Sequence, residues 1–280
     1  MNSPFLEAFA GTNETIPVWF MRQAGRYLPE YQAIKAAHSL ETMFKTPDLA
    51  AEITCQPIDI LGVDAAILFA DILTLPGAMG FKIGFDDRKG PVIDTHFKMK
   101  DVHDHEEIGH ITETIKQVKN KLTRNIPLIG FAGSPFTVLS FLIEGGSSVG
   151  YKKLFKYMKA ETDAFHQLME ILTINTIRYL QQQIKAGVDV VQLFDTCAGI
   201  LSQEDFKDLV LPYVQRIFAA LKVPSIYFVR NTAHLLSLLD LVNSDFLSVD
   251  HTVNLGTPAT LNQIQKGVQG NLFNGNLYLD

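Results

Sequence analysis

The stretch Pro17-Val-Trp-Phe-Met-Arg22-Gln-Ala-Gly-Arg26-Tyr-Leu-Pro-Glu30-Tyr31 says most about how this chain folds. Its apolar part, residues 16–21, predicts a buried strand. Two arginines follow at once and flank Gln23-Ala24-Gly25. A guanidinium donates two parallel hydrogen bonds to a carboxylate and keeps its charge away from water, and glycine permits a tight turn. The stretch therefore predicts an anion-binding loop at the end of a core strand, although arginines paired with acidic partners within the fold would give the same pattern.

Composition favours one α/β domain over residues 1–280. The chain is 47% apolar and 19% charged, and its length suits a barrel of about 250 residues. No uninterrupted apolar run of about 18 residues occurs, so no membrane span is expected. The N-terminus has no basic leader, and Cys55 and Cys197 lie far apart, which together favour the reducing cytoplasm.

The charge balance narrows the possible ligands. The net charge is −6, and no basic face of the kind that binds nucleic acid is visible. The overall sign also repels anionic ligands. Any anionic ligand must therefore be held by a local cluster of cations, which strengthens the prediction that Arg22 and Arg26 bind an anion.

Short apolar runs alternate with long helical patterns, which predicts parallel βαβ units. Helical spacing covers Ile111–Leu122, Tyr151–Ala186 (as two helices) and Gln203–Leu221. A closed (β/α)8 barrel needs eight strands, so we expect a barrel that lacks the eighth strand and its helix. The expected strands are the seven runs Ile16–Met21, Ala65–Ala70, Pro127–Ala132, Val188–Phe194, Pro224–Val229, Phe246–Val249 and Val268–Gly270.

Polar residues follow most of these strands. In α/β proteins the carboxyl ends of parallel strands meet at one face, and chemistry collects there. The sequence thus predicts a site that mixes cations with carboxylates. Its members would come from Arg22 and Arg26, Asp71, Asp195-Thr196-Cys197, Arg230-Asn231-Thr232, and Asp250-His251.

Five ordered motifs resemble those of the uroporphyrinogen decarboxylase family, and together they span essentially the whole chain. The first is the arginine stretch quoted above. The others are Phe69-Ala-Asp71-Ile-Leu, Gly130-Phe-Ala-Gly-Ser-Pro-Phe-Thr with Ile143-Glu-Gly-Gly-Ser-Ser148, Gln192-Leu-Phe-Asp-Thr-Cys-Ala-Gly199, and Gln269-Gly-Asn-Leu272.

The resemblance implies a (β/α)8 homodimer that removes the four acetate carboxyls of uroporphyrinogen III to give coproporphyrinogen III in haem biosynthesis, without metal or organic cofactor. It implies catalytic roles for Asp71, Arg22 and Arg26. Asp71 would face the pyrrole N–H groups, and the arginines would grip carboxylates. The substrate-binding residues it implies are Arg22, Gln23, Ala24, Gly25, Arg26, Lys35, Asp71, Phe141 and Thr196.

The chain departs from the family pattern at several places. Phe141 stands where the family has a tyrosine, so a hydroxyl is lost, and Lys35 replaces an arginine. The sequence ends before the family's last βα unit with its Asn-Leu-Gly-His-Gly motif. We therefore expect lower stability and activity than in a longer relative. Two alternatives remain: a catalytically impaired tetrapyrrole-binding relative, and a barrel methyltransferase that uses zinc and cobalamin.

The run His103-Asp104-His105-Glu106-Glu107, with His110, has residue types that bind metals. An acidic, solvated helix start is the favoured interpretation, because carboxylates stabilise the positive end of a helix dipole. Gly145–Gly150 is expected to be a turn between helices or the mobile edge of a lid over the cleft. Cys197 is expected to be a buried apolar residue, with a reactive thiol as the alternative.

Overall fold

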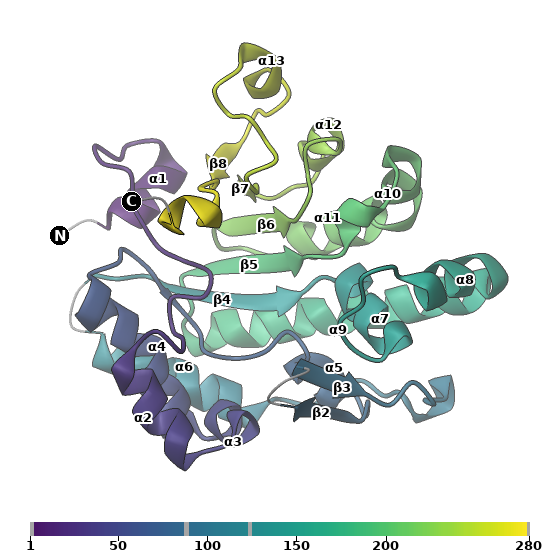
Figure 1. Cartoon of the computed structure of the whole chain (residues 1–280), viewed down its shortest axis with the longest axis horizontal. Helices are drawn as coiled ribbons and strands as arrows, with labels where there is room; N and C mark the ends of the chain where they lie inside the picture. The colour runs from purple at the N-terminus through teal and green to yellow at the C-terminus, as the bar shows by residue number, and fades with distance from the viewer. Residues whose placement is uncertain (1–2, 87–89, 123–124, 279–280) are drawn as a thin grey trace.

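The computed structural model describes residues 3–86, 90–122 and 125–278. A parallel sheet of six strands runs through its centre, in the order β1-β4-β5-β6-β7-β8 (Figure 1). An antiparallel hairpin of β2 and β3 lies apart from it. The strands are β1 (Ala66–Ile67), β2 (Ile83–Asp86), β3 (Gly90–Ile93), β4 (Leu128–Gly133), β5 (Val190–Asp195), β6 (Ser225–Val229), β7 (Phe246–Ser248) and β8 (Gly267–Gln269).

Helices connect and cover the strands. Local sequence explains several of their ends: Ser39 accepts a hydrogen bond from the Thr42 N–H and starts one helix, and Gly62, at φ 68°, ends another. The α-helices are α1 (Pro4–Ala10), α2 (Pro29–Ala37), α3 (Leu40–Lys45), α4 (Pro47–Leu61), α5 (Thr74–Ala78), α6 (Gly109–Lys121), α7 (Pro135–Glu144), α8 (Lys152–Ala160), α9 (Thr162–Ala186), α10 (Gln203–Leu209), α11 (Leu211–Ala219), α12 (Leu236–Leu239) and α13 (Pro258–Leu261).

The expected α/β class is confirmed, and six of the seven expected strands are present in the parallel sheet. All six residues of β4 are buried, as expected for a strand that is covered on both faces. The two helices expected in 151–186 are α8 and α9, and the segment expected at 203–221 is divided into α10 and α11. The hairpin of β2 and β3 was not anticipated.

The expected first strand, Ile16–Met21, is wrong. The structure has no strand there, and Ile16, Val18 and Phe20 are exposed rather than buried. The segment still runs beside β1, because the Asp64 N–H donates to the Val18 carbonyl at 2.9 Å. In return, the Val18 N–H donates to the Asp64 carboxylate at 2.7 Å, so a side chain takes the place of a second ladder bond.

Side-chain hydrogen bonds show that the sheet curls strongly. The Gln269 amide on β8 donates to the Gln192 side-chain oxygen on β5 at 3.1 Å, although β6 and β7 lie between these strands. Gln269 in turn accepts a hydrogen bond from the Trp19 indole N–H at 3.2 Å. Such contacts across two strands require the sheet to wrap around an interior, as in a barrel. The segment that contains Trp19 therefore lies near both β1 and β8.

The apolar core lies between the sheet and the helices around it. The longest helix, α9, contacts β4 through a buried glutamine. The Gln183 oxygen accepts from the Phe131 N–H at 2.9 Å, and its amide donates to the Phe131 carbonyl at 2.8 Å. The side chain fits because Gly130 has no Cβ, which would lie 2.4 Å from the Gln183 oxygen.

The arginine loop is anchored by Gln23, which is 1% exposed. Its amide donates to the Ala65 carbonyl at 3.0 Å, next to β1, and its oxygen accepts from the Phe20 N–H at 3.2 Å. The Leu28 N–H donates to the Gly25 carbonyl and closes the following turn. Gly25 itself does not have a positive φ, so the turn does not depend on glycine there.

We predict that Gln183→Leu lowers the free energy of unfolding by about 2–6 kcal/mol, because a buried N–H and a buried C=O both lose their partner at about 1–3 kcal/mol each. Chemical denaturation measures this. The matched control is Gln181→Leu on the same helix, an exposed position, where we expect a change within about 0.5 kcal/mol. Equal effects at both positions would contradict the anchoring role.

We also predict that Gln23→Leu loosens the arginine loop, because the Phe20 N–H and the Ala65 carbonyl both lose their hydrogen-bond partner. Limited trypsin digestion should then cut after Arg22 and Arg26 at least several times faster, while cleavage after Arg178 keeps its rate. Gln117→Leu, on α6, serves as the control. An unchanged cleavage pattern in Gln23→Leu would show that the loop is held by other contacts.

Candidate functional site

The carboxyl ends of the central strands share one edge of the sheet and pack closely there. Gly133 ends β4, and a Cβ atom at this position would lie 3.1 Å from the Ile72 Cβ, just beyond β1. Gly199 follows β5, and a Cβ there would lie 1.8 Å from the Arg230 carbonyl oxygen, just beyond β6. Residues that follow different strands are thus brought into contact along this edge.

Asp71 lies at this edge and is partly exposed. Its carboxylate accepts a hydrogen bond from the Leu73 N–H at 2.8 Å. Burial raises the pKa of Asp71 above its ordinary value, whereas the Leu73 N–H and the charge of Arg22 act to lower it. The hydrogen bond from Gln23 to the Ala65 carbonyl, next to β1, places the arginine loop in the same region of the fold.

The arginine loop offers two exposed cations. Arg22 and Arg26 are exposed, and neither forms an ion pair within the described residues. The alternative interpretation was that acidic residues of the fold pair with these arginines. No ion pair of this kind occurs among the described residues. Ala24 and Gly25 are half-buried between them. Lys35 lies on α2, which follows the loop, and is half-buried.

Phe141 and Thr196 come from α7 and from the end of β5, and both are half-buried. Thr137, one turn before Phe141, connects their elements. Its hydroxyl donates to the Asp195 carboxylate at 2.7 Å and accepts from the Cys197 N–H at 3.0 Å. The predicted residues therefore form two groups, one around Arg22 and Asp71 and one around Phe141 and Thr196.

Asp195 is fully buried, and its hydrogen bonds hold parts of the fold together. Its carboxylate accepts hydrogen bonds from the hydroxyls of Ser134, Thr137 and Tyr227, at 2.9, 2.7 and 2.7 Å. Burial raises the pKa of Asp195, and the hydroxyls partly oppose this shift. These donors connect β5 to β6 and to α7, so this carboxylate holds the edge of the sheet together.

The interior of the sheet presents an aromatic surface that sequence reasoning missed. Phe194 pairs with Phe228 on the next strand, and their rings meet edge to face at 5.8 Å. Phe131 contacts Phe194 in the same way at 5.4 Å. Phe194 is two residues from Gln192 and so lies on the same face of β5, the face that bonds to β8 across the interior. Alternation along the expected strands was the available signal for this surface.

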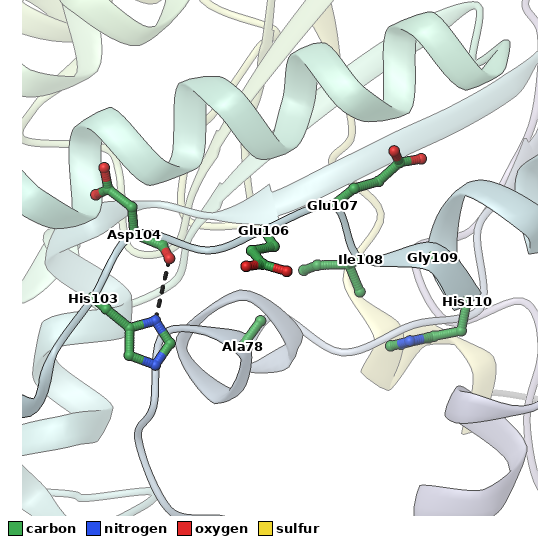
Figure 2. Close-up of a pocket in the computed structure, with 8 residues that line it drawn as sticks. All are labelled: Ala78, His103, Asp104, Glu106, Glu107, Ile108, Gly109 and His110. Carbon is green, nitrogen blue, oxygen red and sulfur yellow. Dashed lines mark hydrogen bonds between the residues drawn. The ribbon is translucent and has the colours of Figure 1, made fainter.

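A surface pocket of about 610 Å³ is lined by several residues of the kinds that bind metals, namely His103, Asp104, Glu106, Glu107 and His110 (Figure 2). His103–Glu107 form a loop before α6 rather than the expected helix start, because α6 begins at Gly109. The side chains diverge: Asp104 bonds to Asn175 and Arg178 on α9, while Glu107 accepts from Thr112. In the described part of the chain, no group of three His, Cys, Asp or Glu residues is arranged to hold a metal ion.

A second pocket, of about 540 Å³, lies between α3, α5, β2 and the start of α6. It includes Leu73 and Thr74, the second and third residues after Asp71. Its wall is largely aromatic and aliphatic, with Phe44, Phe81 and Phe85 among its members.

No helix in the part of the chain that the structure describes has both the length and the hydropathy needed to cross a bilayer.

Solved structures with similar folds support the barrel-like arrangement. A methyltransferase from Methanosarcina mazei has a TM-score of 0.79 at 21% identity, and the match covers 96% of this chain and 82% of that one. A B12-independent methionine synthase from Shewanella sp. W3-18-1 has a TM-score of 0.58 at 15% identity, covering 83% and 71%. At these identities the likeness concerns the fold alone.

Sequence relatives are far more similar. Proteins named uroporphyrinogen decarboxylase are 46% identical in Thermodesulfovibrio yellowstonii and 42% identical in Desulfotalea psychrophila. The first match covers 97% of this chain and 82% of the relative, and the second covers 99% and 83%. The family model for uroporphyrinogen decarboxylase (URO-D) matches residues 1–280. The chain therefore belongs to the uroporphyrinogen decarboxylase family.

Proposed function

We propose that this protein is a carboxy-lyase that converts uroporphyrinogen III to coproporphyrinogen III by removing its four acetate carboxyls. The observation that carries this proposal is the match of the family model over the whole chain, together with relatives at 40–46% identity. The geometry agrees with it, since exposed arginines and a partly buried carboxylate lie at the edge where the strands end.

Each decarboxylation needs a place for the electron pair of the breaking C–C bond. A pyrrole that is protonated at a ring carbon can accept this electron pair, because it is a cation conjugated to the breaking bond. When CO2 leaves, the pair forms an exocyclic double bond; a proton then adds to the methylene to give a methyl group, and the ring carbon loses its proton. Each acetate thus consumes one proton and releases one CO2.

In this proposal Asp71 stabilises the cationic ring. Its negative charge attracts the protonated pyrrole more strongly than the neutral one, so it lowers the barrier instead of merely binding substrate. The partly buried position strengthens this attraction, because water screens the charge less there. The Leu73 N–H and Arg22 favour the ionised form of the carboxyl group that the role requires.

We assign Arg22 and Arg26 to carboxylates that do not react in a given step. A tight grip on the leaving carboxylate would stabilise the ground state and slow the reaction. Gln23, Ala24, Gly25 and Lys35 belong to the same binding region in this proposal. The rings of Phe194 and Phe228, with the buried Phe131 behind them, would contact the apolar macrocycle, and Thr196 and Phe141 would lie beside it.

The proposal extends to the state of the protein. We propose a single-domain homodimer that acts in the cytoplasm, without nucleic acid as a partner. The net charge of −6 supports the last point, because nucleic-acid binding requires a basic surface.

Steady-state conversion of uroporphyrinogen III, followed by separation of the porphyrins according to their number of carboxyls, tests this function. We expect the eight-carboxyl substrate to disappear and the four-carboxyl product to accumulate with the release of CO2. Binding of the macrocycle without CO2 release would instead favour the impaired relative, an outcome to which the missing hydroxyl at Phe141 would contribute.

We predict that Asp71→Asn lowers turnover about 10²–10³-fold, because the charge that stabilises the ring cation is lost. The amide oxygen can still accept from the Leu73 N–H. In the control Asp59→Asn, at an exposed position on α4, turnover should not change. Full activity in Asp71→Asn would contradict the assigned role.

The same variant should be as stable as the parent chain, or more stable, at neutral pH. Burial raises the folded-state pKa of Asp71 above 3.8, so its ionised form opposes folding once the pH exceeds that raised value. This unfavourable contribution to folding disappears as the pH falls below 3.8, because the carboxyl group is then protonated in both states. Asparagine has no such contribution at any pH. Urea denaturation at pH 7 measures the difference.

A further inference from the structure

Two non-glycine residues in the described part of the chain have a positive φ: Tyr151 at 48° and Asn231 at 59°. L-residues adopt this conformation at an energetic cost, and it persists where surrounding contacts enforce it, often at binding sites. Tyr151 precedes α8 and contacts Cys197, which follows β5. Asn231 is the second residue after β6. The two strained positions thus lie at the carboxyl ends of neighbouring strands.

Contacts on both sides hold Tyr151 in place. Its N–H donates to the Ser148 hydroxyl at 3.2 Å, and the Glu144 carboxylate accepts from the Leu154 N–H at 2.9 Å at the start of α8. The phenol oxygen lies 3.5 Å from the Cys197 sulfur. A thiol is a weak hydrogen-bond partner. The hydroxyl can therefore still donate to a stronger acceptor.

Arg230 supplies a cation directly after β6, the strand next to β5. Its carbonyl packs against Gly199, beside Cys197, and the next residue, Asn231, donates its N–H to the Asp250 carboxylate. The Arg230 side chain is exposed and forms no ion pair within residues 3–86, 90–122 and 125–278. Burial and Cys197 raise the pKa of Tyr151 to about 12, against a small lowering by Arg230. The phenol is thus a protonated donor at neutral pH.

We propose that the Tyr151 hydroxyl and the Arg230 guanidinium form a carboxylate-binding subsite at the ends of β5 and β6. It holds a side-chain carboxylate of the macrocycle that does not react, and this assignment rests on the proposed function. In the sheet, β6 is three strands from β1, which corresponds to about 14 Å along the sheet. A ring with carboxylates on all sides needs cations on more than one side, and Arg22 and Arg26 lie at the β1 side.

The test uses Tyr151→Phe, which removes only the hydroxyl, Arg230→Gln at its exposed position, and the double variant. The probe is uroporphyrin, the stable oxidised octacarboxylate, whose equilibrium binding is followed by fluorescence. Each single variant should bind about tenfold more weakly, which corresponds to about 1.4 kcal/mol. The double variant should lose less than the product of the single losses, because both groups hold one carboxylate. Tyr157→Phe, a half-buried tyrosine on α8, is the matched control and should bind normally.

Kinetics with uroporphyrinogen give a second readout. KM should rise in both single variants while kcat stays within about twofold, since the subsite binds ground state and transition state alike. A purely structural role for Tyr151 would instead lower the thermal unfolding temperature of Tyr151→Phe and leave binding at low temperature unchanged. That result would overturn the subsite. So would binding within twofold of the parent in either single variant, or a double variant whose loss equals the product of the single losses.

Binding and turnover are measured separately, so the two proposals can fail separately. If the parent chain binds uroporphyrin but does not decarboxylate uroporphyrinogen, the proposed function fails and the binding of the variants still decides the subsite. If the parent turns over and the variants bind normally, only the subsite fails. A parent chain that does not bind the macrocycle at all overturns both.

Discussion

The chain of hydrogen bonds from Trp19 to Gln269 to Gln192 is the constraint on which the placement of the site depends. It crosses the interior between β5 and β8 and ties the segment before the arginine loop to the far edge of the sheet. Hydrogen bonds in series polarise one another, and polar groups in an interior are costly to leave unpaired. This sequence of donors therefore favours one curvature of the sheet. Gln23 holds the loop that carries Arg22 against Ala65, next to β1, and the Trp19 contact adds a tie from the preceding segment to β8.

The curvature allows a negatively charged protein to recognise a polyanion. With a net charge of −6, long-range attraction does not assist the substrate, so recognition must come from cations close to the bound ring. The structure offers Arg22 and Arg26 on one side and Arg230 on the other, and none of them has an ion pair among the described residues. Between the two sides, the aromatic surface around Phe194 is suited to the apolar faces of the pyrrole rings. Charge at the rim and apolar contact in the interior complement the two parts of a carboxylated macrocycle.

Much of this arrangement could be predicted from the sequence, because it depends on local patterns. Continuous apolar runs identified β4, β5 and β6, and the polar residues that follow them identified the edge where we propose the site. The strand expected at Ile16–Met21 failed because apolar character alone does not show whether a partner strand is available. There, Asp64 replaces ladder bonds with a side-chain contact. The roles that we propose for Tyr151 and for the phenylalanine surface depend on contacts between residues distant in sequence, which periodicity cannot reveal.

Asp71 and Asp195 show most clearly what a sequence pattern leaves open. Both are aspartates on the carboxyl side of a strand of the parallel sheet, Asp71 four residues after β1 and Asp195 as the last residue of β5, and burial raises the pKa of both. Asp195 is surrounded by three hydroxyl donors and is closed off from solvent, so its acceptor capacity is used within the fold. Asp71 has one backbone donor, is partly exposed and is influenced by the cation Arg22, so one of its oxygens remains available to a ligand. Surroundings, and not residue type or position on the strand, make one carboxylate structural and the other suited to stabilise a cation.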